Sequence, residues 1–417
     1  MLLQRLLDRL VRLGDLTVID SKGRTYRRSG LPSPDFVPCV IRLHDPSLSW
    51  KLALHPNLAF GEAYMNGTLT IEEGGLYNCL ALLTENIQQA GLGCGIGFVE
   101  RLAMLGRRLQ HYNPVRRSRA NVAHHYDLSS SLYDLFLDAD RQYSCAYFPA
   151  PGTSLEEAQA AKKRHLAAKL MLKPGQKVLD IGSGWGGLAL TLARMNDVDV
   201  TGITLSEEQL KMATDRVSQA HFESQVRFRL EDYRQHQGRY DRIVSVGMFE
   251  HVGTLHYREY FSKIRDLLAE DGVAVIHSIG RADGPGQTNA WIRKYIFPGG
   301  YIPALSEVFP AIERSGLIVT DVEILRLHYA DTLKEWARRF QANRSRAAEI
   351  YDERFCRMWE FYLAGCEATF RHGLMMVFQI QLSRRIDTVP LTRDYIYEFE
   401  RVHKAATVPQ LDTAGQK

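Results

Sequence analysis

The sequence has little that would mark a membrane-spanning, metal-binding or nucleic-acid-binding protein. Its 417 residues contain no run of about 20 apolar residues, so no membrane-spanning helix is expected. Only six cysteines occur and none forms a CxxC pair, which predicts no metal site, argues against a disulfide scaffold and favours a reducing cytoplasm. The formal net charge of +4 is too balanced for a dedicated nucleic-acid-binding protein. Hydrophobic residues make up 45% and charged residues 24%, which is typical of a globular chain of two or three domains.

The small positive charge is unevenly distributed. Residues 1–120 contain 15 Lys and Arg against 10 Asp and Glu, whereas the remainder has a net charge of −1. Six arginines fall between residues 101 and 119, which suits either an anionic membrane surface or a solvated linker. The first 16 residues carry leucines at helical spacing, interrupted by charged residues. This pattern predicts an amphipathic helix that packs on its own domain or lies on a membrane, and not a signal peptide.

The chain divides into two predicted domains. Residues 1–115 indicate a small basic α+β domain with strands near 36–43 and 68–71. Strands and helices then alternate, which predicts an α/β catalytic domain (residues 116–410) with a doubly wound parallel sheet. Two aromatic-rich helical insertions, residues 281–315 and 332–371, are expected to cap the carboxyl ends of the strands, and residues 411–417 to form a flexible tail. The expected strands of the sheet are 177–181, 198–203, 226–230, 241–247, 272–279, 317–325 and 375–382.

A glycine-rich segment, VLDIGSGWGG at residues 178–187, leaves a predicted strand and enters a predicted helix. Its glycines match G-x-G-x-x-G, a pattern that NAD enzymes share. An NAD site expects an acidic residue about 20 residues further on, but the next strand ends in Thr204 and Ser206. Asp180 directly precedes the loop, and Glu231 and Asp232 end the third strand. These features favour S-adenosylmethionine over NAD.

Seven motifs then stand in a characteristic order. They are YSCAYF (143–148), VLDIGSGWGG, GITLSEEQ (202–209), MFEHVG (248–253), IHSIG (276–280), WIRKYIFPGG (291–300) and LHYADTLKEW (327–336). Together they resemble the cyclopropane-fatty-acyl-phospholipid synthase family, and GEAYMNGTLTIEEGG (61–75) extends the resemblance into the first domain. The resemblance implies a Rossmann-like class I methyltransferase that uses S-adenosylmethionine to add a methylene across a cis double bond of a membrane phospholipid. It also implies a cytoplasmic enzyme, peripheral at the inner membrane face, and a possible homodimer.

The resemblance also implies two sets of site residues. A bound bicarbonate would be held by Cys145, Glu250, His277, the backbone of Ile279, and Tyr329. In this set His277 and Tyr329 would donate to the anion and Glu250 would accept its hydroxyl, whereas Cys145 would be a ligand or packing group. His124 and His125 receive no role. The implied cofactor contacts are Tyr143, Ser144, Asp180, Gly182, Gly184, Gly186, Thr204, Leu205, Gln209, Glu231, Asp232 and Tyr233.

Three other functions remain open from the sequence. A lipid methyltransferase of the same family could give a methyl-branched or methylene product. A small-molecule N-methyltransferase could share the fold and a YSC-type motif, although the basic first domain favours a lipid. A lipid-binding protein without enzymatic activity is disfavoured by the complete cofactor loop.

Overall fold

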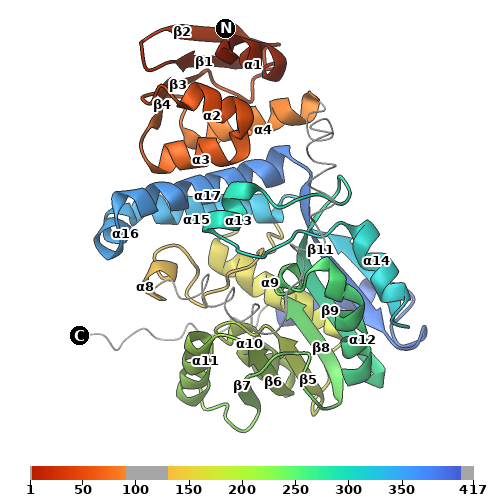
Figure 1. The fold of residues 1–417 in the computed structure, drawn as a ribbon. Coiled ribbons are helices and arrows are strands. Elements are labelled where there is room, and N and C mark those ends of the chain that lie inside the picture. The colour runs from red at the N-terminus through yellow and green to blue at the C-terminus, as the bar shows by residue number, and fades with distance from the viewer. Residues whose placement is uncertain (1, 91–129, 405–417) are drawn as a thin grey trace. The chain divides into compact units, whose positions relative to one another are not determined.

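The computed structural model describes residues 2–90 and 130–404 (Figure 1). It divides into two compact units, each built from several chain segments. The predicted boundary near residue 115, the arginines at 101–119, His124, His125 and the predicted tail lie outside the described residues. No helix in the described ranges is long and apolar enough to cross a membrane. Unit 1 comprises Met1–Gln110, Gly286–Gly300 and Tyr329–Met375, and unit 2 comprises His111–Pro285, Tyr301–His328 and Met376–Lys417.

Unit 2 contains a seven-stranded sheet in the order β10-β11-β9-β8-β5-β6-β7. The strands β5 to β9 pair in parallel, whereas β10 and β11 pair antiparallel. This arrangement confirms the predicted Rossmann-like class, and every predicted strand is present within four residues at each end. The strands are β5 (Lys177–Ile181), β6 (Asp199–Thr204), β7 (Val226–Leu230), β8 (Tyr240–Val246), β9 (Leu268–Arg281), β10 (Ile318–Ile324) and β11 (Met375–Ser383).

Helices cover both faces of this sheet because successive strand residues point to opposite sides. Val178 and its neighbours on one face pack with α9 and α10, whereas Leu179 and its neighbours on the other face pack with α12 and α14. Strands buried on both faces explain the continuous apolar runs that made them predictable. The helices of unit 2 are α8 (Ser130–Tyr133), α9 (Leu155–Leu170), α10 (Gly187–Asn196), α11 (Glu207–Gln219), α12 (Tyr257–Leu267), α14 (Leu305–Glu313) and α18 (Asp394–His403), with the 3-10 turns η1 (Phe249–His251) and η2 (Thr254–His256).

Unit 1 contains a four-stranded sheet in the order β2-β1-β3-β4 (Figure 1). Leu7 and Val11, in and just after the first helix, are buried in the same apolar core as the sheet. The amphipathic helix therefore packs on its own domain, one of its two predicted placements. The elements are α1 (Leu2–Leu10), β1 (Asp15–Ile19), β2 (Thr25–Ser29), β3 (Cys39–Leu43), α2 (Leu48–Leu54), α3 (Pro56–Met65), β4 (Leu69–Glu73), α4 (Leu76–Gln89), α13 (Ala290–Tyr295), α15 (His328–Ala342), α16 (Arg344–Ile350) and α17 (Glu353–His372).

The two aromatic-rich insertions are divided differently from the prediction. The sequence analysis assigned both to the catalytic domain, but residues 286–300 and 329–375 belong to unit 1. Phe361 of α17 contacts the rings of Phe60 and Tyr64 on α3, with centroid distances of 6.0 Å to each. The Trp291 ring of α13 lies 4.7 Å from the Phe361 ring. These aromatic side chains bury large apolar areas against the N-terminal helices, which explains the grouping.

Replacing Gly61 by alanine tests this packing. A Cβ on Gly61 would lie 2.5 Å from the Trp291 ring, so we expect the overpacked variant to lose about 1–3 kcal/mol of stability. Gly365 on α17 is a matched helical control, because its Cβ would meet only Leu80, at 3.9 Å. Alanine there is expected to be neutral or to stabilise by about 0.5–1 kcal/mol. Chemical denaturation measures both effects, and equal changes in the two variants would contradict the packing.

Candidate active site

The glycine-rich loop joins β5 to α10 with backbone conformations that favour glycine. Gly182 has a φ of 82° and Gly186 also has a φ of 82°, both in the left-handed region. A Cβ on Gly186 would lie 2.7 Å from the Phe228 ring of β7. Gly186 is the N-cap of α10 and packs closely against Phe228, but it does not line the pocket described next.

A pocket lies at the carboxyl ends of β5, β6, β7 and β8, where ligands bind in open α/β sheets. Eleven of the twelve residues predicted to contact the cofactor line it, and Gly186 is the exception. Their contact with a cofactor stays a prediction, although one pocket gathers them from four separate segments. The eleven are Tyr143, Ser144, Asp180, Gly182, Gly184, Thr204, Leu205, Gln209, Glu231, Asp232 and Tyr233.

Asp180 presents an unsatisfied acceptor to this pocket. Its side chain is 1% exposed, and within the described residues Oδ2 has no hydrogen-bond partner. Burial raises the pKa of Asp180 to about 7, although the nearby Lys162 opposes this shift. A buried carboxylate oxygen without a partner is costly, so the site suits a ligand that carries hydrogen-bond donors, as S-adenosylmethionine does.

The acidic pair after β7 is already engaged. Arg234 forms two hydrogen bonds with the Asp232 carboxylate, at 2.9 Å to Oδ1 and 2.7 Å to Oδ2. Glu231 Oε2 lies 2.9 Å from Nδ1 of His236. Both carboxylates are predicted cofactor contacts, but the sequence gives no sign of either partner. Their orientation is therefore set by the protein before any ligand binds.

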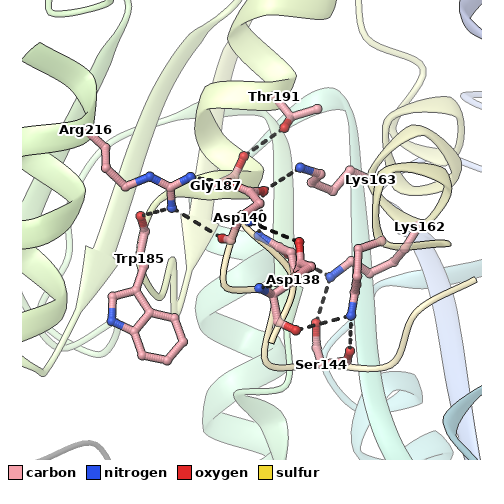
Figure 2. Close-up of polar contacts among 11 residues, drawn as sticks. Asp138, Asp140, Ser144, Lys162, Lys163, Trp185, Gly187, Thr191 and Arg216 are labelled. Atoms are coloured by element: carbon pink, nitrogen blue, oxygen red, sulfur yellow. Dashed lines mark hydrogen bonds and ion pairs between the residues drawn. The ribbon is translucent and has the colours of Figure 1, made fainter. Parts of the chain in front are cut away.

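A carboxylate also occupies the beginning of α10. Asp140 forms ion pairs with Lys163 of α9 and Arg216 of α11 (Figure 2). A Cβ on Gly187, the first residue of α10, would collide with this carboxylate. In dinucleotide-binding proteins the pyrophosphate sits at this helix terminus. A negative side chain in that place opposes a pyrophosphate and agrees with the choice of S-adenosylmethionine over NAD.

Glu250 and Ile279 form the centre of the predicted anion site. The Ile279 amide donates to Glu250 Oε1 over 2.7 Å, and Oε2 has no partner within the described part of the chain. Burial raises the pKa of Glu250 to about 7. The N–H of Ile279, whose backbone is predicted to contact the anion, therefore donates to Glu250. Its carbonyl accepts from the Ser278 hydroxyl at 3.0 Å.

His277 lies two residues before Ile279 on β9, so both face the same side of the sheet. Burial, with Lys162, Lys169 and His165 nearby, holds the pKa of His277 well below its usual range, so the ring is neutral. The Gln379 amide nitrogen lies 3.1 Å from His277 Nδ1. A donor at Nδ1 assigns the ring proton to Nε2, which can then donate to an anion.

The two other predicted anion ligands lie in different surroundings. Cys145 is fully buried, and its Sγ lies 3.3 Å from the Ala146 carbonyl oxygen. Tyr329 belongs to unit 1, where its ring packs 4.8 Å from Phe370 and 5.9 Å from Trp336. Glu250, His277 and Ile279 therefore belong to unit 2, whereas Tyr329 belongs to unit 1.

The sequence profile of the mycolic acid cyclopropane synthetase family matches residues 114–380, more than half of the chain. The chain belongs to this family. It is accordingly an S-adenosylmethionine-dependent methyltransferase, and the predicted resemblance and fold class are confirmed.

Individual family members align over most of the chain. A probable fatty acid methyltransferase of Pseudomonas putida is 38% identical, over 84% of this chain and 87% of its own. The cyclopropane-fatty-acyl-phospholipid synthase of Escherichia coli K12 is 36% identical, over 86% of this chain and 92% of its own. The solved structure of mycolic acid cyclopropane synthase CmaA1, complexed with SAH and CTAB, is 36% identical with a TM-score of 0.61. It covers 65% of this chain and 99% of its own.

The pocket of this family member also includes residues that the sequence analysis missed. Arg141 and Gln142 directly precede YSCAYF, and Arg234 follows Asp232 by two residues, so nearness to a motif was the available signal. Gln379 lies outside this pocket and contacts His277; it carried no signal, because the two residues are 102 positions apart in the chain. The other missed lining residues are Ile181, Ser183, Trp185, Leu188, Ile203, Val246, Gly247, Met248, His251 and Val252.

Proposed function

We propose that the protein transfers a methylene group from S-adenosylmethionine to the cis double bond of an unsaturated acyl chain in a membrane phospholipid, forming a cyclopropane ring. The observation that carries this proposal is an acceptor on η1 that is bonded to β9, together with a donor on β9 itself. Glu250 Oε2 is a buried acceptor with no partner among the described residues, and neutral His277 presents an N–H. Bicarbonate has both a hydroxyl to donate and anionic oxygens to accept, so this pair fits it.

The chemistry requires a methyl donor and a base. S-adenosylmethionine would supply an electrophilic sulfonium methyl group; its transfer to an alkene carbon would release S-adenosylhomocysteine and leave a carbocation in the acyl chain. Ring closure then needs the new methyl group to lose one proton, and bicarbonate would supply the base for it. Glu250 and His277 would orient that base, with Cys145 and Tyr329 as the further proposed ligands.

The aromatic segments suit the protection of a carbocation. Water would hydrate the cation, whereas aromatic faces stabilise positive charge without reacting with it. Within unit 1 the rings of Trp291, Phe361, Trp359 and Tyr362 form close pairs, with centroid distances of 4.7 Å and 5.2 Å. The aromatic composition of the segments 281–315 and 332–371 supports a role in shielding the acyl chain.

A peripheral position on the inner membrane face is part of the proposal. Trp50 and Leu54 lie one turn apart on α2 and are 64% and 68% exposed, as suits side chains that enter a lipid surface. The net positive charge of residues 1–120 favours anionic lipid. The homodimer is proposed from the family resemblance alone.

A second candidate is a lipid methyltransferase with an acyclic product. It is favoured by the Pseudomonas putida relative, which is named a probable fatty acid methyltransferase. The hypothesis of a small-molecule N-methyltransferase is supported only by similarity of fold. Coclaurine N-methyltransferase is 22% identical with a TM-score of 0.63.

Proton NMR of the product separates the two lipid candidates. The purified protein is incubated with S-adenosylmethionine and vesicles of unsaturated phospholipid, and the acyl chains are then released. We expect the strongly shielded methylene protons of a cyclopropane ring and their loss when bicarbonate is removed. Mass alone does not distinguish the products, because a ring and a methylene branch both add CH2. Turnover with olefinic methylene or methyl-branch signals and no shielded protons would establish the acyclic product.

A further inference from the structure

Lys162 is a fully buried lysine on α9, and it contacts two residues that line the cofactor pocket, Gln142 and Ser144 (Figure 2). Its Nζ donates to Gln142 Oε1 at 2.7 Å and to Ser144 Oγ at 2.8 Å. Neither acceptor is charged, and in the described part of the chain no carboxylate forms an ion pair with this ammonium. A buried cation is retained at a cost, so one without a carboxylate partner indicates a functional role.

A second residue of α9 holds the same segment. Gln159, one turn before Lys162, donates through Nε2 to the carbonyl oxygens of Gln142 and Ser144, at 3.2 Å and 3.0 Å. Gln142 in turn donates through Nε2 to Asp140 Oδ2 at 3.1 Å. The backbone and side chains of residues 142–144 are thereby fixed from one helix face.

The bond from Lys162 determines what Ser144 can do. An ammonium has only donors, so the Ser144 oxygen must accept from it, and the hydroxyl hydrogen remains to be donated elsewhere. No acceptor for that hydrogen occurs within the described residues. Ser144 lines the pocket, as does Asp180 with its unpartnered oxygen. The pocket therefore combines an oriented donor backed by a cation with the unpartnered carboxyl oxygen of Asp180.

This combination complements a zwitterion. The methionine end of S-adenosylmethionine carries a carboxylate and an ammonium group. We propose that Lys162 is a positioning residue that makes Ser144 a donor to the cofactor carboxylate, and that its charge selects ligands bearing that carboxylate. This inference rests on the proposed cofactor contacts of Ser144 and Asp180.

Binding of two ligands to the full-length protein tests the inference. S-adenosylhomocysteine and its decarboxylated analogue differ only in the carboxylate, and titration calorimetry gives both affinities without turnover. We expect Lys162→Met to weaken the binding of S-adenosylhomocysteine by about 10- to 100-fold, the range for loss of a charge-assisted hydrogen bond. The decarboxylated analogue should change by less than about threefold, because it lacks the group that this bond serves. A merely structural role would weaken both ligands equally, and that result would overturn the proposal.

Two further variants keep the test decisive. Lys169 is also fully buried on α9 but pairs with Glu323 and does not line the pocket, so Lys169→Met controls for loss of a buried lysine. Lys169→Met should lower thermal stability but leave unchanged the ratio of the affinities for S-adenosylhomocysteine and its decarboxylated analogue. Ser144→Ala removes the hydroxyl that would donate to the cofactor carboxylate, with little change in volume. It should lower the preference for S-adenosylhomocysteine over the decarboxylated analogue, as Lys162→Met does. An intact ratio in Ser144→Ala would overturn the proposal even if Lys162→Met does not fold. If the wild type binds neither ligand, the proposed cofactor contacts fail instead.

Discussion

Glu250→Gln is expected to lower kcat by about 100- to 10,000-fold, the usual range for a group that serves a proton transfer. Glutamine keeps the acceptor for the Ile279 amide but places an NH2 donor where the unpartnered Oε2 stands. That donor cannot accept the hydroxyl hydrogen of bicarbonate. Affinity for S-adenosylhomocysteine should stay within about threefold, because Glu250 does not line the cofactor pocket. Single-turnover kinetics and calorimetry give the two quantities.

The same variant should be more stable than the wild type at alkaline pH. Burial raises the pKa of Glu250 from 4.5 to about 7, so folding disfavours its ionised form. The loss of folding stability is absent while the carboxyl is protonated in both the folded and the unfolded state. It grows as pH rises from 4.5 to 7. Removing it should stabilise the protein at pH 8 by on the order of 3 kcal/mol, and the gain should shrink as pH falls toward 5. Denaturation at both pH values measures this.

Glu367→Gln is the matched control. Glu367 is also buried, and burial likewise raises its pKa to about 7, but it lies on α17 beside Arg371. We expect its activity to be retained. Full activity and unchanged bicarbonate dependence in Glu250→Gln would refute the proposed role. A parallel loss of S-adenosylhomocysteine affinity would show that Glu250 supports the cofactor pocket instead.

Asp140→Ala should destabilise unit 2 by about 3–5 kcal/mol, the usual loss when one partner of a buried ion pair is removed. The side chains of its partners Lys163 and Arg216 are only 6% and 12% exposed, so the variant leaves two cations poorly solvated. They come from α9 and α11, and Asp140 also abuts the first residue of α10. One carboxylate thus links three helices around the cofactor loop. Chemical denaturation followed by circular dichroism measures the loss.

Asp134→Ala provides the comparison. Asp134 pairs with Arg141 through two bonds of 2.7 Å, but its side chain is 51% exposed, so we expect a loss of no more than about 1 kcal/mol. Burial alone would raise the pKa of Asp140, but Lys163 and Arg216 outweigh it and lower that pKa. The stability that Asp140 contributes is therefore present above the unfolded-state pKa and is lost as pH falls through the folded-state value. Equal losses in the two variants would mean that the Asp140 cluster is an ordinary surface pair.

The sheet and the cofactor loop were predictable because their signals are local. β5 and residues 272–279 of β9 are short, largely apolar runs, and burial on both faces of the sheet keeps them nearly continuous. The loop residues Gly182 and Gly184 stand directly beside their strand. Family motifs supplied the rest of the candidate site, because single residues such as His277 have no distinguishing local pattern.

Other features depend on partners that the sequence does not reveal. An amphipathic helix such as α17 shows an apolar face but not what covers it, and Phe60 and Tyr64 lie about 300 residues away. Lys162 stands in a run of charges on α9 that usually marks a solvated surface, yet it is fully buried. The bond between Glu250 and the Ile279 amide involves the backbone, and no residue type announces it.

The grouping of α13 and α17 with the first domain has a consequence for recombination of the gene. The chain passes between the two units five times, so no single cut separates them. Deleting the first 110 residues would remove α3 and α4 and leave the aromatic face of α17 without its covering. A fragment that begins after this point would expose that face to water and to other chains. The first 110 residues are therefore only part of unit 1, and they cannot be exchanged as one continuous gene segment without exposing the rest of that unit.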